Sequence, residues 1–141
     1  MNILGELDEL PKKTRDVLEK AMEDSKENTG LNLNICMNYG GQREILLAAK
    51  QYARDVVEHK ADFSLDEKGF EQYLMTKDFP PVDLLIRTSG ELRISNYLLW
   101  QIAYAELCFV DEAWPDFTEE VLARCIDAYQ NRDRRFGGVK E

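Results

Sequence analysis

The sequence is poor in the residues and motifs of several large functional classes. It has one histidine, His59, and three widely spaced cysteines that form no CxxC motif. Catalysis by a Ser-His-Asp or Cys-His set and metal binding through histidine are therefore not expected. No GxGxxG or GxxxxGK[ST] motif occurs, so nothing indicates a dinucleotide site or a P-loop. No apolar run approaches the ~18 residues of a transmembrane helix.

The cysteines and the first residues bear on cellular compartment. Cys36, Cys108 and Cys125 are odd in number and lie in apolar segments, a pattern typical of reduced cytosolic thiols. The opening stretch, MNILGELDEL, is acidic and lacks the basic and apolar regions of a signal peptide. We therefore expect a cytoplasmic protein without a transmembrane segment.

Basic charge is scarce. The formal net charge of −9 argues against a broad nucleic-acid footprint and against binding to an anionic membrane surface. The end of the chain differs, because residues 131–141 (NRDRRFGGVKE) carry four basic residues and two acids. This segment is either a solvated C-terminus or a small basic patch that could meet a phosphate.

The remaining pattern is one of alternating strands and helices. The 141 residues fit a single domain over 1–141, and 44% hydrophobic residues supply a sizeable core. The expected strands cover 2–5, 31–38, 82–87 and 107–110. The first expected helix begins at Pro11 and ends before Asn28-Thr29-Gly30. Further helices are expected over 42–58, 66–75 and 96–105, and a last helix is capped by Asp116 or Thr118. This order predicts an α/β fold with a three-layer, mostly parallel sheet and helices on both faces.

Helical spacing also predicts which side chains point inward. For 42–58 they are Ile45, Leu46, Ala49, Tyr52, Ala53 and Val56. For the last helix they are Val121, Leu122, Cys125, Ile126 and Tyr129. The segment 96–105 is apolar nearly all round, which is typical of a helix buried in a core or in a subunit interface.

Two arginines and a serine follow the strand 82–87. Arg87 ends this strand, and its forked donors match phosphate oxygens. Arg93 lies across a glycine-containing loop, and Ser95 stands where an N-cap belongs, beside the unpaired first amides of a helix. Together they resemble a diphosphate cradle. The alternative is that the arginines pair with nearby acids and that Ser95 only caps its helix.

Glu106 is the acid between the apolar segment 96–105 and the next strand. A carboxylate in apolar surroundings needs a cation or strong donors. Mg²⁺ is one such cation, because it often bridges one or two carboxylates to a substrate diphosphate. The alternative is a structural salt bridge to an arginine.

A second candidate region follows the strand 31–38. In parallel sheets ligands bind at the carboxyl ends of strands, where Asn38, Tyr39, Gly40 and Gly41 lie. The two glycines allow close approach of a ligand to the backbone. They are equally compatible with a plain turn from strand to helix.

These segments carry a family resemblance. Residues 83–109, DLLIRTSGELRISNYLLWQIAYAELCF, closely resemble the signature of the cis-prenyltransferases, the undecaprenyl diphosphate synthase family. The blocks that agree with it are LNLNICMNYGGQREI at 31–45, WPDF at 114–117 and RDRRFGG at 132–138. The resemblance is colinear and covers essentially the whole chain. It implies condensation of isopentenyl diphosphate with an allylic diphosphate, assisted by Mg²⁺.

The resemblance also implies roles for individual residues. Arg87, Arg93 and Ser95 match residues that hold the isopentenyl diphosphate group, and Glu106 matches an acid that helps to bind Mg²⁺. Arg135 and Gly137 match a C-terminal element that reaches a phosphate site across a dimer. Asn38, Tyr39, Gly40 and Gly41 match a turn near the site. The segment 96–105 matches part of the dimer interface.

One family element does not occur in these 141 residues. Family members carry an Asp-Gly-Asn-Gly-Arg-Trp-Ala type motif that binds Mg²⁺ and the allylic diphosphate, and the sequence contains no such motif. We therefore expect these residues to hold the isopentenyl diphosphate half of the site, with little synthase activity alone. The alternative is a non-catalytic subunit or pseudoenzyme that dimerises with a complete cis-prenyltransferase. The expected partners are isopentenyl diphosphate and another copy of the chain or a complete subunit.

Overall fold

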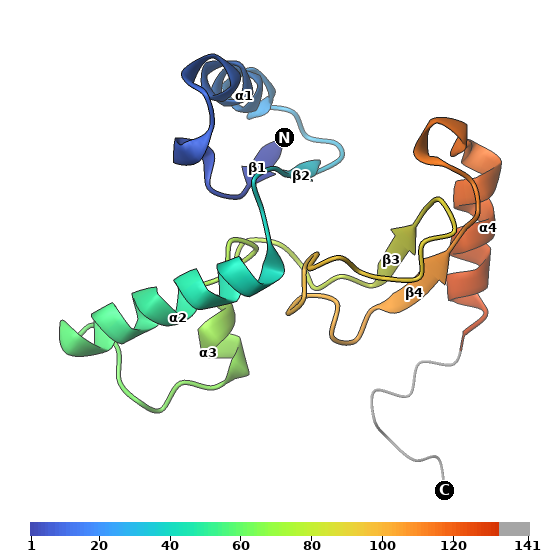
Figure 1. Cartoon of the computed structure of the whole chain (residues 1–141). Coiled ribbons are helices and arrows are strands. Elements are labelled where there is room, and N and C mark those ends of the chain that lie inside the picture. Colours follow the sequence, from blue (N-terminus) through green and yellow to red (C-terminus); the bar gives the residue numbers. More distant parts are fainter. Residues whose placement is uncertain (133–141) are drawn as a thin grey trace, which may run out of the picture. The chain divides into compact units, whose positions relative to one another are not determined.

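The structure is a computed structural model that describes residues 1–132 and divides into two units, Met1–Pro80 and Pro81–Glu141. Figure 1 shows the helices and strands of both units in chain order. Each unit contains one pair of parallel strands. The expectation of a single domain over 1–141 remains a prediction.

The first unit opens with a strand, a helix and a parallel strand. β1 (Asn2–Leu4) pairs with β2 (Asn34–Cys36), and α1 (Lys12–Ser25) connects them after a short 3₁₀ turn. These elements confirm the first strand and helix predicted from the sequence, while β2 is shorter than the predicted 31–38. Gly5 ends β1 with φ 138°, and a Cβ there would lie 1.9 Å from the Met37 carbonyl oxygen. Only glycine therefore lets the two strand ends approach so closely.

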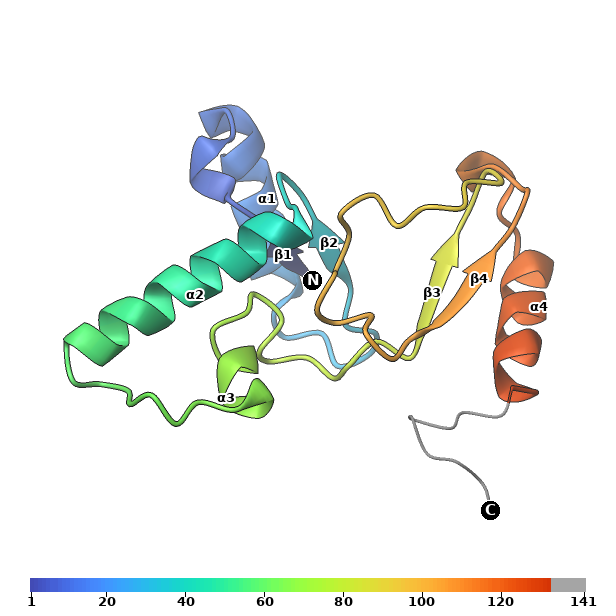
Figure 2. The ribbon, with the colours of Figure 1, turned by 60° about the horizontal axis from the view of Figure 1, so that its bottom comes forward.

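The second part of this unit is a helical pair. α2 (Gly41–Val57) packs against α3 (Glu67–Glu71), as both views show (Figures 1 and 2). The buried residues of α2 are Gly41, Glu44 and Ala48. The inward face predicted for 42–58 is thus partly wrong: Leu46, Ala49 and Ala53 are exposed. The buried face can include the charged Glu44 because this carboxylate has hydrogen-bond donors inside the unit.

The second unit pairs β3 (Leu84–Arg87) with β4 (Glu106–Phe109) in parallel. α4 (Glu119–Gln130) follows a 3₁₀ turn at Trp114–Asp116 and packs on β4 (Figure 2). Of the two predicted caps, Thr118 is the N-cap, and its hydroxyl accepts a hydrogen bond from the Val121 amide at 3.5 Å.

The inner face of α4 is narrower than the sequence suggests. Val121 and Cys125 are buried, whereas Leu122 and Ile126 are 40% and 41% exposed. The buried pair is four residues apart, so it forms a single line along the helix that faces β4. The neighbouring apolar positions lie beside this line and remain in contact with solvent.

The helix predicted over 96–105 is wrong. This segment forms successive turns, with positive φ at Ser95, Asn96 and Leu98. An all-round apolar helix needs packing on every side, but Ile102 is the buried residue here and Tyr104 is 72% exposed. Without that packing, the apolar sequence alone does not fix a regular helix.

Candidate functional site

Arg87 is the last residue of β3 and lies at the carboxyl edge of the β3–β4 pair. Its side chain is half-buried, and its Nε is buried with no hydrogen-bond partner within residues 1–132. An unpaired buried donor is costly, and a guanidinium N–H pairs best with an anionic oxygen. The structure therefore leaves at Arg87 a donor that fits a carboxylate or phosphate.

The loop after Arg87 is closed by its own backbone bonds. The Ser89 amide donates to the Glu112 carbonyl at 2.8 Å, and the Gly90 amide donates to the Val110 carbonyl at 2.9 Å. Both residues have positive φ. These amides are already used within the protein, so the loop supports Arg87 without offering its own N–H groups to an anion.

Arg93 and Ser95 lie in the same unit on the exposed connection between β3 and β4. The Arg93 side chain is 66% exposed and forms an ion pair with Glu91. An exposed pair of this kind is weak and exchanges readily for another anion. Ser95 is exposed with φ 48°, which is not the extended conformation of an N-cap. The predicted capping role of Ser95 is therefore wrong, because residues 96–105 form turns and no helix begins at Asn96.

Glu106 lies away from Arg87 on the strand pair. The register pairs Glu106 with Leu84 and Arg87 with Phe109, so three residues, about 10 Å, separate the two positions along the strands. Since side chains alternate between faces, Glu106 and Arg87 also point to opposite faces. These residues of one chain are therefore not brought together.

Glu106 instead pairs with an arginine from the end of α4. The Arg132 Nη1 donates to Glu106 Oε2 at 2.8 Å, and the Glu106 side chain is 23% exposed. This is the salt-bridge alternative, with Arg132 as a partner that the sequence did not suggest. It ties the chain just after α4 to the first residue of β4.

The described residues do not form a Mg²⁺ site by themselves. Within residues 1–132 no three acidic, histidine or cysteine side chains gather where they could hold a metal ion. Glu106 supplies a single carboxylate, and a guanidinium already neutralises it. Mg²⁺ prefers several oxygen ligands, some of which a substrate diphosphate commonly provides.

The turn Asn38–Gly41 is held firmly within the first unit. Asn38 has φ 49°, and its Nδ2 donates to the Glu6 carbonyl at 3.0 Å and to Glu9 Oε2 at 3.2 Å. Glu6 accepts two bonds of 2.7 Å from Arg43, and these hold the pKa of Glu6 below its usual value. The loop after β1 is thereby tied both to the turn and to α2.

Glu44 also holds this turn, and the sequence analysis missed it. Glu44 is 2% exposed, accepts a hydrogen bond of 2.5 Å from the Tyr39 hydroxyl, and accepts one of 2.9 Å from the Met75 amide. The available signal was its spacing, since Glu44 and Ala48 occupy successive turns of one helical face. Apolar periodicity alone gives no reason to place a carboxylate there.

Arg135 and Gly137 lie outside the described residues, so their predicted role stays a prediction. The same holds for the whole basic segment beyond Arg132.

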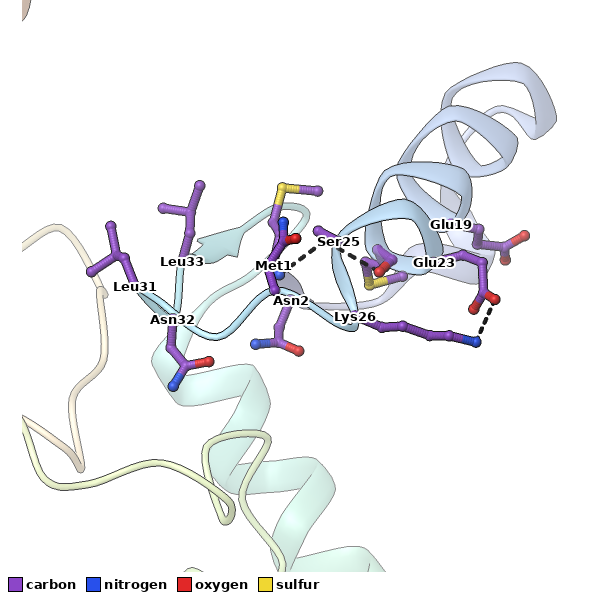
Figure 3. A pocket seen from close by; sticks show the side chains of 11 residues that line it. Met1, Asn2, Glu19, Glu23, Ser25, Lys26, Leu31, Asn32 and Leu33 are labelled. Carbon is purple, nitrogen blue, oxygen red and sulfur yellow. Dashed lines mark hydrogen bonds and ion pairs between the residues drawn. The ribbon is translucent and has the colours of Figure 1, made fainter.

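A cavity of about 720 Å³ opens at the amino edge of β1 and β2 (Figure 3). Its lining includes Asn2, Leu31 and Leu33, none of which was predicted to bind a ligand. Lys26 lies on its rim and pairs with Glu23 at 2.5 Å. The Met1 ammonium also lines the cavity and donates to the Ser25 hydroxyl at 3.0 Å. The cavity is distant in register from the Asn38–Gly41 turn, which follows the opposite ends of these strands.

None of the helices within residues 1–132 combines the length and the apolar character needed to cross a membrane.

Comparison with known proteins identifies the relatives of this chain. A family model described as "Putative undecaprenyl diphosphate synthase" matches residues 1–137. An isoprenyl transferase from Bacillus thuringiensis subsp. konkukian (strain 97-27) is 52% identical over 140 residues, which cover 99% of this chain and 54% of that protein. The Micrococcus luteus protein named "Ditrans,polycis-undecaprenyl-diphosphate synthase ((2E,6E)-farnesyl-diphosphate specific)" is 49% identical over 139 residues, 96% of this chain and 55% of its own.

Solved structures agree. Lavandulyl diphosphate synthase from Lavandula x intermedia, in complex with dimethylallyl diphosphate, is 37% identical with a TM-score of 0.92 over 96% of this chain and 59% of its own. A probable undecaprenyl diphosphate synthase from Campylobacter jejuni is 35% identical with a TM-score of 0.81, over 96% and 61%. The chain thus spans about half the length of the curated relatives that it matches. These likenesses confirm the predicted α/β fold class, and the chain belongs to the undecaprenyl diphosphate synthase family, the cis-prenyltransferases.

Proposed function

We propose that residues 1–141 hold the isopentenyl diphosphate half of a cis-prenyl-transfer site and have little synthase activity by themselves. The reaction of the complete site is the condensation of isopentenyl diphosphate with an allylic diphosphate. Family membership supports the reaction class. The assignment of a half-site to this chain is our inference from its own residues.

The observation that carries the proposal is the unpaired Nε of Arg87. This donor is buried at the carboxyl edge of a parallel strand pair, the edge at which α/β proteins bind their ligands. A diphosphate would supply the anionic oxygens that Arg87 lacks within residues 1–132. A carboxylate would also satisfy the donor, but the family's substrates favour the diphosphate.

Arg93 and Ser95 complete the proposed half-site. Arg93 would exchange Glu91 for a phosphate oxygen, which is a small cost because the pair is exposed. Ser95 would donate its hydroxyl directly. Arg135 and Gly137 remain part of the proposal as a second phosphate contact supplied from another copy of the chain.

The allylic half-site is the reason to expect little activity. The 141 residues contain no Asp-Gly-Asn-Gly-Arg-Trp-Ala type motif. Chain elongation requires both substrates to be held in reacting geometry, so one diphosphate site alone cannot provide the main rate advantage.

Mg²⁺ enters the proposal as the ion used by the family, with Glu106 as the acid assigned by resemblance. Because Arg132 holds this carboxylate, we expect residues 1–141 to bind isopentenyl diphosphate through arginines even without the ion. A requirement for Mg²⁺ in this binding would contradict that expectation.

A direct test measures binding and turnover on the same preparation. Calorimetry should detect isopentenyl diphosphate binding to the 141-residue chain, and radiolabelled isopentenyl diphosphate with farnesyl diphosphate should give no elongated product. Unchanged affinity in Arg87→Ala would defeat the assignment of the half-site. Elongated product from this chain alone would defeat the claim of little activity.

A non-catalytic partner role is the second candidate, and exposed apolar side chains favour it. In the second unit Leu92, Tyr104 and Trp114 are between 72% and 78% exposed. Such groups commonly mark an interface. We expect association with a second copy or with a complete cis-prenyltransferase, and a clean monomer in light scattering at micromolar concentration would count against it. Raised activity of a complete enzyme on mixing would favour this role over the half-site alone.

A further inference from the structure

Glu44 stands out as the buried charged residue of the described chain. Within residues 1–132 no other charged side chain is buried, and Glu44 is only 2% exposed. A buried carboxylate loses several kcal/mol of hydration unless donors replace water. The fold therefore has to supply those donors, and the position of each one is informative.

Both carboxylate oxygens of Glu44 have a donor. Oε2 accepts a hydrogen bond of 2.5 Å from the Tyr39 hydroxyl, and Oε1 accepts one of 2.9 Å from the Met75 amide. Tyr39 belongs to the link between β2 and α2, and Met75 follows α3. One side chain thus joins three segments: the turn before α2, the helix α2 itself and the connection after α3.

The turn Asn38–Gly41 that Glu44 contacts through Tyr39 also makes hydrogen bonds through Asn38. Asn38 donates to Glu6 and Glu9, on the loop after β1. Asn38 and Tyr39 are neighbours in the chain, but they bind different parts of the same unit: Asn38 binds the loop after β1, and Tyr39 binds Glu44 in α2. Gly40 and Gly41 follow directly and have no side chain with which to fix their own conformation.

We propose that Glu44 is a positioning residue for the turn Asn38–Gly41 at the carboxyl end of β2. It holds the Tyr39 phenol, and through it the two glycines, in a single conformation. Any effect on a ligand rests on the proposed function and on the family resemblance, which matches Asn38–Gly41 to a turn near the site. Its effect on the turn itself does not depend on any ligand.

The test uses the full 141-residue chain with Tyr39→Phe, Glu44→Gln and the double variant. Glu27→Gln is the matched control, because Glu27 is an exposed glutamate of the same unit. Tyr39→Phe removes only a hydroxyl and keeps the ring. It therefore remains informative if Glu44→Gln unfolds the chain. Circular dichroism establishes which variants are folded.

The first readout is NMR relaxation dispersion at the amides of residues 39–41. Microsecond-to-millisecond exchange should appear in both single variants and not in the control. Sharp, unchanged signals in Tyr39→Phe and Glu44→Gln would overturn the proposal. This readout decides the question even if the chain does not bind isopentenyl diphosphate, an outcome that would instead defeat the proposed function.

The second readout is the affinity for isopentenyl diphosphate. Each single variant should weaken binding by about 3- to 10-fold, the scale of one lost hydrogen bond. The loss in the double variant should be smaller than the product of the two single losses, because both variants disturb the Tyr39–Glu44 contact, while Glu44→Gln also alters the contact with the Met75 amide. Losses that multiply in the double variant would mean that Glu44 acts independently of Tyr39, and the positioning role would fall while the half-site stood.

Discussion

The carboxyl edges of the two strand pairs differ in how far the protein satisfies its own polar groups. After β2, Asn38 and Tyr39 are bound by acids of the same unit. After β3, the Nε of Arg87 is buried without a partner in residues 1–132. The turn after β2 is thus fixed by hydrogen bonds within the protein, whereas the end of β3 retains an N–H donor for a ligand. Both positions are strand ends in the sequence. Only the structure shows that the polar groups of Asn38 and Tyr39 have partners within the protein, while the Nε of Arg87 has none in residues 1–132.

The largest expected effect comes from removing the unsatisfied donor. Arg87→Ala should weaken isopentenyl diphosphate binding about 10- to 100-fold, because hydrogen bonds to charged groups contribute about 1.5–3 kcal/mol. Calorimetry at low salt measures it. Arg54→Ala, an exposed arginine of α2, is the control and should leave the affinity unchanged. If both variants lost the same affinity for isopentenyl diphosphate, binding would depend on overall positive charge and not on the unpaired donor of Arg87.

Arg93→Ala should have a smaller effect, about 2- to 5-fold on the same affinity. Arg93 is 66% exposed and already paired with Glu91, so its contact with a ligand is solvent-screened. The loss should shrink further as salt is raised. A loss as large as that of Arg87→Ala would show that Arg93 becomes buried on binding. The connection between β3 and β4 would then change conformation around the ligand.

Arg132→Ala tests whether Glu106 belongs to the Arg87 edge. We expect unchanged isopentenyl diphosphate affinity, since Glu106 points to the other face of the strand pair. Stability to urea should fall by less than about 1 kcal/mol, because the pair is partly exposed. A changed affinity would show that Glu106 and Arg87 cooperate, for instance across two copies of the chain.

The smallest effect concerns the turn after β2 and pH. Hydrogen bonds from Arg43 lower the pKa of Glu6 from its usual value, so the stabilisation from this contact is present above the usual pKa of a glutamate. It is lost as the pH falls through the lower, folded-state value. Urea midpoints between pH 6 and pH 3 should therefore decline less steeply in Glu6→Gln than in the unchanged chain. Identical slopes would mean that the Glu6–Arg43 contact does not hold the turn in solution.

Much of the local structure could be predicted because local patterns determine it. The strand ending at Arg87 and the helix beginning at Gly41 follow from short apolar runs and glycine turns. The arrangement of Arg87 at a carboxyl edge follows from the α/β order alone. The family signature then gives the substrate class, which periodicity could not supply.

The failures share a tertiary cause. The segment 96–105 has the composition of a buried helix but lacks surrounding contacts in this unit, so turns form instead. Glu44 is buried because Tyr39 and Met75 supply donors, and no local pattern announces them. Arg132 reaches Glu106 from 26 residues away, so sequence spacing did not indicate it.

The proposed half-site binds isopentenyl diphosphate, and residues 1–141 do not by themselves bind the allylic substrate well. Calorimetric titration of the 141-residue chain with isopentenyl diphosphate and with farnesyl diphosphate, under one buffer without Mg²⁺, tests this difference most directly. We expect saturable binding of isopentenyl diphosphate and clearly weaker binding of farnesyl diphosphate. No binding of isopentenyl diphosphate, or equal affinity for both, would contradict it.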